Sequence, residues 1–244
     1  MSKESSALAG DPLGEVWDLQ NLAEATRLCS WMLDQFSGAI GGSVLEVGAG
    51  IGTFSERLLE RGASDLLLIE PEPACMEVLE RRFSGDERVE LSQDILPDSP
   101  ALLARPASFD FALCQNVLEH IREQEAAIGA IADALKPGGR IGVLVPAHPA
   151  LFGRLDRGYG HERRYTRKSL RAVLEGSGLV VEDLHSFNLL GVPGWWVKNR
   201  VGSPGVDARS LRVYERLLRV WRPIEERLRP SVGLSVVAVA KKPA

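Results

Sequence analysis

The fold of this 244-residue chain is decided by the stretch Val44-Leu45-Glu46-Val47-Gly48-Ala49-Gly50-Ile51-Gly52-Thr53. Its first four residues are typical of a short buried strand, and a helical pattern begins at Thr53. The three glycines between them, spaced two apart, let the backbone approach a ligand closely, and the following helix offers N–H groups without partners at its start. The stretch therefore predicts a strand–turn–helix unit that binds a ligand.

Strand-like and helix-like segments alternate on both sides of this unit. Further strands are expected over 66–69, 89–93, 109–114 and 141–145, and helices over 16–36, 53–61, 73–83 and 119–135. The last of these helices ends at a Lys136-Pro137-Gly138-Gly139 stop signal. Such alternation predicts a mostly parallel sheet with helices on both faces.

The pattern becomes irregular in the last hundred residues. The expected elements here are a helix over 167–175 and strands over 179–186 and 232–240. Two irregular inserts, 146–167 and 189–231, precede and interrupt them. The second insert carries an arginine-rich helix around 209–222. We therefore divide the chain into an N-terminal helical cap, 1–43, and a core, 44–244. The inserts and the side chains of Trp17, Gln20 and Asn21 are expected to hold a substrate.

Composition excludes several classes of protein. Hydrophobic residues make up 45% of the chain and charged residues 25%, which suits a globular core and excludes disordered and collagen-like chains. The net charge of −4 disfavours general nucleic-acid binding. The charge is uneven, since Arg154 to Arg171 holds seven basic and two acidic side chains. This basic stretch is either a substrate-facing surface or an ordinary solvated one.

The three cysteines, Cys29, Cys75 and Cys114, are far apart and predict neither a disulfide framework nor a zinc site. The first ten residues are polar and small, so no secretory signal is expected, and no apolar run is long enough to span a membrane. These features predict a cytoplasmic protein. The sequence leaves its oligomeric state open.

Acidic residues near the ends of three successive strands restrict the chemical class of the ligand. Glu46 lies two residues before the first glycine, where a carboxylate suits an ammonium group and would repel a pyrophosphate. Because the third glycine, Gly52, also comes one position early for the dinucleotide fingerprint, a nicotinamide-dependent oxidoreductase is disfavoured. Glu70 is placed to accept hydrogen bonds from ribose hydroxyls. Asp94, or an adjacent backbone N–H, could contact an adenine ring.

With these residues in view, the chain resembles the class I S-adenosylmethionine-dependent methyltransferases over roughly 44–145. The resemblance rests on the glycine stretch, Glu70, Asp94, the segment Phe109-Asp110-Phe111-Ala112-Leu113-Cys114-Gln115-Asn116-Val117-Leu118-Glu119-His120-Ile121 and the segment Leu135-Lys136-Pro137-Gly138-Gly139-Arg140. It implies a Rossmann-like three-layer α/β sandwich with a mostly parallel seven-stranded sheet and an antiparallel last strand.

The resemblance also implies a cofactor, S-adenosylmethionine, and roles for particular residues. Its methionine part would lie against Gly48, Ala49 and Gly50, near Glu46. Its ribose would bind Glu70 beside Pro71, its adenine would contact Asp94 and Ile95, and Gln115 with Asn116 would line the pocket near the sulfonium.

The segment Gly160-His161-Glu162-Arg163-Arg164-Tyr165 resembles a subset of these enzymes that act on small molecules. His161 is a candidate base for the acceptor, and Tyr165 or His148 could share that role. In the alternative interpretation His161 caps a loop, and methyl transfer needs no base because positioning supplies much of the rate. Glu119 and His120 are adjacent, diverge on a helix and have no further visible ligand, so no metal is expected.

Trp195 and Trp196 lie in an apolar part of the second insert, where they could anchor the insert, line a substrate site or contact a membrane surface. We predict an enzyme that transfers a methyl group from S-adenosylmethionine to an oxygen or nitrogen atom of a small-molecule acceptor in a biosynthetic reaction. A carbon acceptor, a peptide terminus and a non-catalytic S-adenosylmethionine-binding module remain alternatives.

Overall fold

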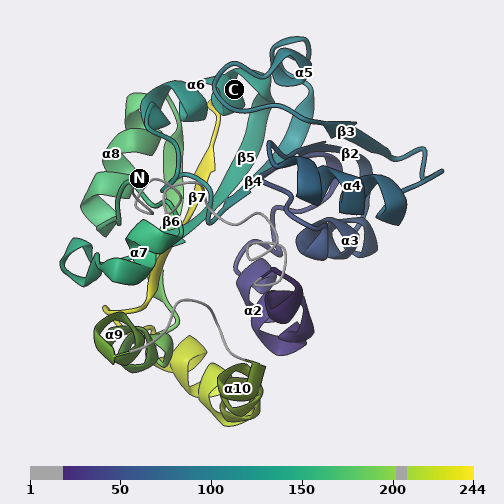
Figure 1. Ribbon diagram of the computed structural model, residues 1–244. Coiled ribbons are helices and arrows are strands. Elements are labelled where there is room, and N and C mark those ends of the chain that lie inside the picture. The colour runs from purple at the N-terminus through teal and green to yellow at the C-terminus, as the bar shows by residue number, and fades with distance from the viewer. Residues whose placement is uncertain (1–18, 202–207) are drawn as a thin grey trace, which may run out of the picture.

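Seven strands form one mixed sheet in the order β3-β2-β1-β4-β5-β7-β6 in the computed structural model, which describes residues 19–201 and 208–244 (Figure 1). The strands are β1 (Gly42–Val47), β2 (Ala63–Ile69), β3 (Val89–Ser92), β4 (Phe109–Gln115), β5 (Leu135–Pro146), β6 (Val180–Phe187) and β7 (Ser235–Lys241). The strands from β3 to β5 are parallel, and β7 runs antiparallel to both β5 and β6.

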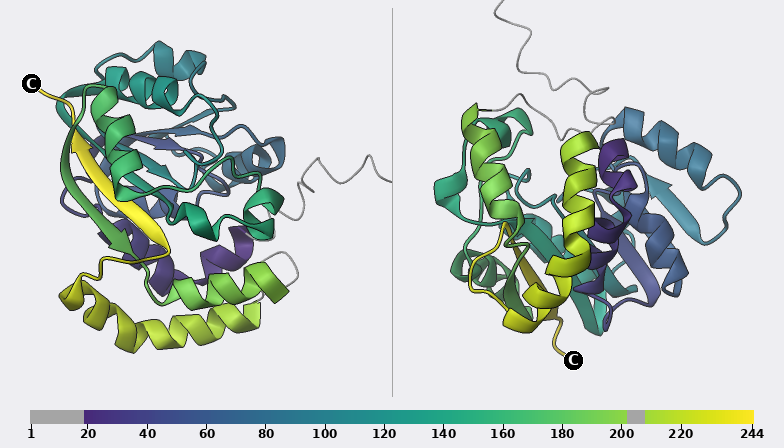
Figure 2. Two further views of the ribbon diagram at one scale, coloured as in Figure 1. Left: turned by 90° about the vertical axis from the view of Figure 1, so that its left-hand side faces the viewer. Right: turned by 90° about the horizontal axis from the view of Figure 1, so that it is seen from below.

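Helices cover both faces of this sheet (Figures 1 and 2). They are α2 (Thr26–Asp34), α3 (Thr53–Glu60), α4 (Pro73–Arg82), α5 (Pro100–Leu103), α6 (Gln124–Ala134), α7 (Arg154–Gly158), α8 (Arg167–Gly176), α9 (Gly191–Val201) and α10 (Ala208–Leu228), with a short 3₁₀ helix at Pro149–Leu151. One core cluster joins the sheet to α6 and α8, and a second joins its other face to α2, α3 and α4. The expected three-layer α/β fold with an antiparallel last strand is therefore confirmed.

Four local expectations differ from the structure. The helix expected over 119–135 begins only at Gln124, because residues 117–122 form turns after β4. The strand expected at 141–145 starts at Leu135 and is longer. The helix expected over 16–36 breaks at Ala25 between helical residues 19–24 and α2, and residues 1–18, including Trp17, lie outside the described residues. The second insert also contains α9, which the sequence did not predict because Gly and Pro residues in its first turn are typical of loops.

Two buried glutamates of α10 hold this helix against its neighbours. The Glu215 carboxylate accepts hydrogen bonds from the backbone N–H groups of Arg27 (3.1 Å) and Leu28 (2.9 Å), at the start of α2. The Glu225 carboxylate accepts from the N–H groups of Asn188 (2.6 Å) and Leu189 (3.0 Å), just before α9. The Glu215 carboxylate thus satisfies N–H groups that the start of α2 leaves without partners, and the Glu225 carboxylate binds the segment that leads into α9. Helix α10 is therefore attached to the start of α2 through Glu215 and to the residues before α9 through Glu225.

Candidate active site

The glycine turn between β1 and α3 has the geometry that the sequence predicts. Gly48, Gly50 and Gly52 have φ values of +71°, +55° and +83°, in the region that disfavours residues with a side chain. A Cβ atom on Gly48 would collide with the Val117 side chain, which follows β4. Ala49 is buried beside them. The turn therefore needs glycine for its backbone conformation and for close packing.

Glu70 closes this turn from the end of β2. Its Oε2 atom accepts a hydrogen bond of 2.7 Å from the Gly50 N–H, and its Oε1 atom accepts one of 3.0 Å from the Glu72 N–H, beside the exposed Pro71. The sequence placed Glu70 and the glycine turn at neighbouring strand ends, and the structure brings them into direct contact. A ribose that binds here would meet a carboxylate already oriented by backbone N–H groups.

Glu46 lies inside the protein beneath the same turn. It is 3% exposed, and its Oε2 atom accepts a hydrogen bond of 2.6 Å from the Ser55 hydroxyl. Burial raises the pKa of Glu46 to about 8, against the hydrogen bond from Ser55, and the nearby Glu70 charge adds to the increase. An ammonium group bound close by would favour the ionised form of this carboxyl.

Asp94 and Ile95 follow β3 at the same edge of the sheet. The Asp94 Oδ2 atom accepts hydrogen bonds from the hydroxyls of Ser92 (2.7 Å) and Ser99 (2.8 Å), and these bonds lower the pKa of Asp94. Ile95 is 64% exposed although it is aliphatic. An oriented carboxylate beside an exposed apolar side chain fits a flat, partly polar ring such as adenine.

Gln115 and Asn116 end β4, next to β1 in the sheet. Both amide atoms of Gln115 are buried and have no hydrogen-bond partner among the described residues. Asn116 is exposed and has a φ of +53°, an uncommon conformation for a residue with a side chain. Buried polar atoms normally have partners, so Gln115 is suited to a ligand that supplies them.

The helical residues 19–24 lie close to this edge. The Leu19 side chain is 3.3 Å from the position that a Cβ atom on Gly50 would take. Asn21 is buried, and its Nδ2 atom has no hydrogen-bond partner among the described residues. The N-terminal helical residues therefore approach the glycine turn, and the substrate cap over 1–43 stays a prediction.

The segment 161–165 lies across the ends of β4 and β5. The Glu162 N–H donates to the Glu119 carbonyl oxygen (2.8 Å), just after β4, and the Tyr165 N–H donates to the Pro146 carbonyl oxygen (2.8 Å), at the end of β5. Because β4 lies beside β1, the segment reaches the same edge of the sheet as the glycine turn. The sequence-predicted candidates His161 and Glu46 therefore belong to one region of the fold.

His161 is oriented by a residue that sequence reasoning missed. Its Nδ1 atom is 3.0 Å from Asp156 Oδ1, and the Arg164 Nε–H donates to the same oxygen at 2.6 Å. Burial favours the neutral form of Asp156, but the hydrogen bonds from His161 and Arg164 hold its pKa below the usual value. An ionised carboxylate only accepts hydrogen bonds, so Nδ1 of His161 donates to Asp156, and in the neutral tautomer of this pair Nε2 is the atom with the lone pair. This is the geometry of a histidine prepared to accept a proton.

The other two candidate bases have different surroundings. Tyr165 is 2% exposed, and its hydroxyl lies 2.6 Å from Gln124 Oε1 and 3.1 Å from the Leu118 carbonyl oxygen. Burial raises the pKa of this phenol above its usual value. His148 has a φ of +58°, and its buried Nε2 atom has no partner among the described residues. Of the three candidates, His161 combines partial exposure with an orienting carboxylate.

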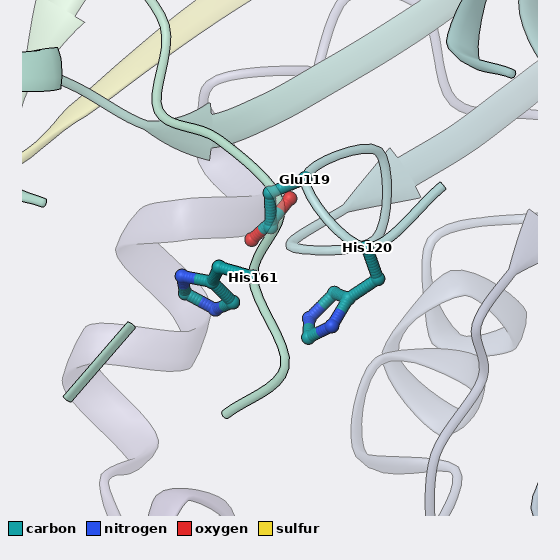
Figure 3. Close-up of side chains that lie close together, drawn as sticks. All are labelled: Glu119, His120 and His161. Atoms are coloured by element: carbon teal, nitrogen blue, oxygen red, sulfur yellow. The ribbon is translucent and has the colours of Figure 1, made fainter. Parts of the chain in front are cut away.

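Glu119, His120 and His161 lie close together, as Figure 3 shows, although the sequence offered no third ligand beside the Glu-His pair. One potential ligand atom from each lies within 4.8 Å of the others. Both carboxyl oxygens of Glu119 are buried without a hydrogen-bond partner among the described residues, and burial raises its pKa to about 8. These three residues could hold a divalent ion, so the expectation of a metal-free site stays a prediction.

Trp195 and Trp196 of α9 have different surroundings. Trp195 is half-buried, and the Arg164 guanidinium lies 4.7 Å from the centre of its ring. Trp196, on the same helix, is 46% exposed. Trp195 thus anchors α9 to the segment that holds His161, whereas Trp196 presents apolar surface.

Taken with the strand order, this edge of the sheet defines a Rossmann-like α/β protein with a candidate ligand site at the carboxyl ends of its strands. A family model described as a methyltransferase domain matches residues 22–184. The sequence is 36% identical over 214 residues to the ubiquinone biosynthesis O-methyltransferase of Idiomarina loihiensis, covering 75% of this chain and 84% of that protein.

Two further likenesses agree with this match. The ubiquinone biosynthesis O-methyltransferase of Xylella fastidiosa is 36% identical over 162 residues, which cover 59% of this chain and 63% of that protein, less than two thirds of its length. The Burkholderia thailandensis 1,6-didemethyltoxoflavin-N1-methyltransferase, whose structure contains 1,6-didemethyltoxoflavin and S-adenosylhomocysteine, has a TM-score of 0.56 and 22% identity over 90% of this chain and 79% of that one. This last likeness concerns the fold. The chain belongs to the methyltransferase-domain family, and it is a methyltransferase.

Proposed function

We propose that the protein transfers a methyl group from S-adenosylmethionine to a hydroxyl oxygen of a small-molecule acceptor. The oxygen acceptor is supported by the names of the relatives from Idiomarina and Xylella, which are O-methyltransferases. A biosynthetic role in the cytoplasm agrees with those names and with three buried cysteines, none of which forms a disulfide. The observation that carries the proposal is the oriented His161–Asp156 pair at the same edge of the sheet as the glycine turn.

The residues at the edge of the sheet fit S-adenosylmethionine. Glu70 would bind the ribose, Asp94 and Ile95 would contact the adenine, and the buried amide of Gln115 would gain the partners that it lacks. Glu46 would face the ammonium group. When bound, S-adenosylmethionine supplies a methyl group on a positively charged sulfur, which is a strong methyl donor.

His161 would act on the acceptor hydroxyl. Its Nε2 atom would take the hydroxyl proton as the oxygen attacks, and the ionised Asp156 would stabilise the imidazolium that results. Arg164, which is bonded to Asp156 and to the Ala147 carbonyl oxygen (2.9 Å), would keep this carboxylate in place. His161 is thus the proposed catalytic base, and Asp156 and Arg164 are positioning residues.

The first test uses S-adenosylmethionine with a labelled methyl group, incubated with the protein and a lysate of the cells from which it comes. Label in a small-molecule fraction is expected, and alkaline stability of the product would distinguish an ether from an ester. Label confined to macromolecules would contradict a small-molecule acceptor. If S-adenosylhomocysteine binds but no fraction gains label, the non-catalytic module is favoured instead.

The second test concerns His161. His161→Ala should lower turnover on the order of a hundredfold while leaving S-adenosylhomocysteine affinity unchanged. His185→Ala is a matched control, since His185 also contacts an aspartate (Asp183, 2.9 Å) but lies on β6. Equal turnover in both variants would refute the base assignment. The assays are run with and without Mg²⁺, because Glu119 and His120 lie beside His161.

A further inference from the structure

Helix α10 carries an apolar stripe on its outer side. Its members recur at helical spacing along about four turns and are each between 40% and 68% exposed: Val213, Leu217, Val220, Ile224 and Leu228. The opposite side of the helix is the one that packs, through the buried Leu211 and Leu218. The helix therefore has two apolar faces, one of which no described residue covers.

The outward direction of this stripe is determined by the packing of the other face. Glu215 and Glu225 are buried and bind the backbone N–H groups that precede or begin α2 and α9. Rotating α10 to bury the outer stripe would expose the apolar inner face and remove both carboxylates from their partners. Five exposed aliphatic side chains are thus a stable feature of this surface. Such a continuous patch is unusual on a soluble face without a binding role.

Arginines border the stripe. Arg212, Arg216, Arg219 and Arg227 are exposed on α10, where the exposed acid among the described side chains is Glu226. Arg219 also lines a shallow groove of about 310 Å³ between α10 and α2, together with Arg27 and Arg222. This basic surface stands out in a chain whose net charge is −4. Aliphatic residues with adjacent arginines are the pattern of a helix that lies in the interface of an anionic bilayer.

The surface lies at the end of the molecule that holds the site. The insert leaves the sheet after β6 and returns at β7, and Ser235 of β7 pairs with both Phe187 and Pro146, at the carboxyl ends of β6 and β5. Figures 1 and 2 show α9 and α10 together at this end, with α2 beside α10. Trp196 and Val197 of α9 add exposed apolar surface there. No helix among the described residues is long and apolar enough to cross a membrane.

We propose that the outer face of α10 binds the surface of an anionic lipid bilayer, with the apolar stripe among the acyl chains and the arginines at the phosphates. Charge favours this partner over a second copy of the chain. A symmetric pair would bring the exposed arginines of both copies to one interface, where Glu226 is the exposed acid of the helix. The proposal goes beyond the methyl-transfer reaction and does not depend on it.

The test is co-sedimentation of the protein with vesicles, which needs no enzymatic activity. Vesicles of phosphatidylcholine alone are compared with vesicles containing about one third phosphatidylglycerol, at low and high salt. Two variants alter the surface: Leu217→Gln/Val220→Gln and Arg216→Gln/Arg219→Gln. Matched controls are Leu103→Gln/Val180→Gln, which changes two exposed aliphatic residues on α5 and β6, and Arg81→Gln/Arg171→Gln, on α4 and α8. All of these positions are exposed, so the fold should be retained, and thermal unfolding checks it.

The wild-type protein and both controls should bind the anionic vesicles and lose binding at high salt. The arginine variant should bind on the order of tenfold more weakly, and the aliphatic variant should lose measurable binding. The proposal is overturned if wild type ignores anionic vesicles, binds neutral vesicles equally well, or is matched by both variants. It is equally overturned if the wild type is a dimer in solution and Leu217→Gln/Val220→Gln converts it to a monomer, because a second copy would then cover the stripe.

Discussion

The substitution Glu119→Gln tests whether the buried Glu119 carboxyl is protonated in the folded protein. It removes a carboxyl group whose pKa differs between the folded and the unfolded chain. The side chain is 1% exposed, and neither carboxyl oxygen has a hydrogen-bond partner among the described residues. Burial therefore raises the pKa of Glu119 to about 8, from an ordinary value of 4.5. Glutamine has nearly the same shape and carries no proton that pH can remove.

The change in the free energy of unfolding with pH follows from the difference in protons bound by Glu119 in the folded and unfolded chain. Between pH 4.5 and 8 the folded protein keeps a proton on Glu119 that the unfolded chain has released, so the free energy of unfolding falls as pH rises. The stabilisation from the protonated Glu119 is complete below the pKa of the unfolded chain, 4.5, and is lost as pH rises through the pKa of the folded protein, about 8. From pH 6 to pH 8 the loss from one such carboxyl is about 2 kcal/mol. Glu46, with its pKa also near 8, contributes a similar loss.

Urea unfolding at pH 6 and pH 8, with a chelator present, measures this difference. The wild-type protein should lose about 4 kcal/mol between the two pH values, and Glu119→Gln about half of that. Glu175→Gln, at an exposed glutamate paired with Arg171 (2.9 Å), should behave like wild type. An identical pH dependence in wild type and Glu119→Gln would refute the reasoning. Glu119 would then be ionised in the folded protein at pH 6.

Three further predictions concern the ligand and the base. S-adenosylhomocysteine affinity, measured by calorimetry, should increase about tenfold from pH 6 to pH 7 in wild type, since the ionised Glu46 is favoured by an ammonium group, and should be nearly independent of pH in Glu46→Gln. Gly50→Val should abolish this binding. Gly85 also has a positive φ (+79°), but a Cβ atom there would meet open space, so Gly85→Val should leave binding intact; equal affinity in both variants would exclude the turn as the binding site. Asp156→Asn should lower turnover and shift its pH profile, because His161 loses the carboxylate that orients it; an unchanged profile would remove Asp156 from the mechanism.

The parts of the structure that follow from local sequence could be predicted. The glycine turn, the buried strands and the acids at their ends are encoded by neighbouring residues, so the sheet and the residues around Glu46, Glu70 and Asp94 were expected from the sequence. The turn after β4 was mistaken for helix, because residues 119–135 continue an apolar pattern that begins outside the helix.

The remaining parts depend on contacts between distant residues. Asp156 is one of two acids in a basic stretch, and only the fold shows that it is buried against His161 and Arg164. Glu215 is separated by 187 residues from Leu28, whose N–H it binds. An acidic residue on an arginine-rich helix is ordinarily part of a solvated face, so nothing in the local pattern distinguished these carboxylates from surface charges.

The attachment of α10 through Glu215 and Glu225 bears on how such enzymes can be recombined. The insert supplies the N-terminal cap of α2, a helix almost two hundred residues earlier, and Ala25, which precedes α2, has no capping side chain of its own. A chimaera that exchanges 189–231 with a relative must therefore exchange the start of α2 as well. The insert 189–231, which we expect to form part of the acceptor side, is therefore not a segment that can be exchanged alone.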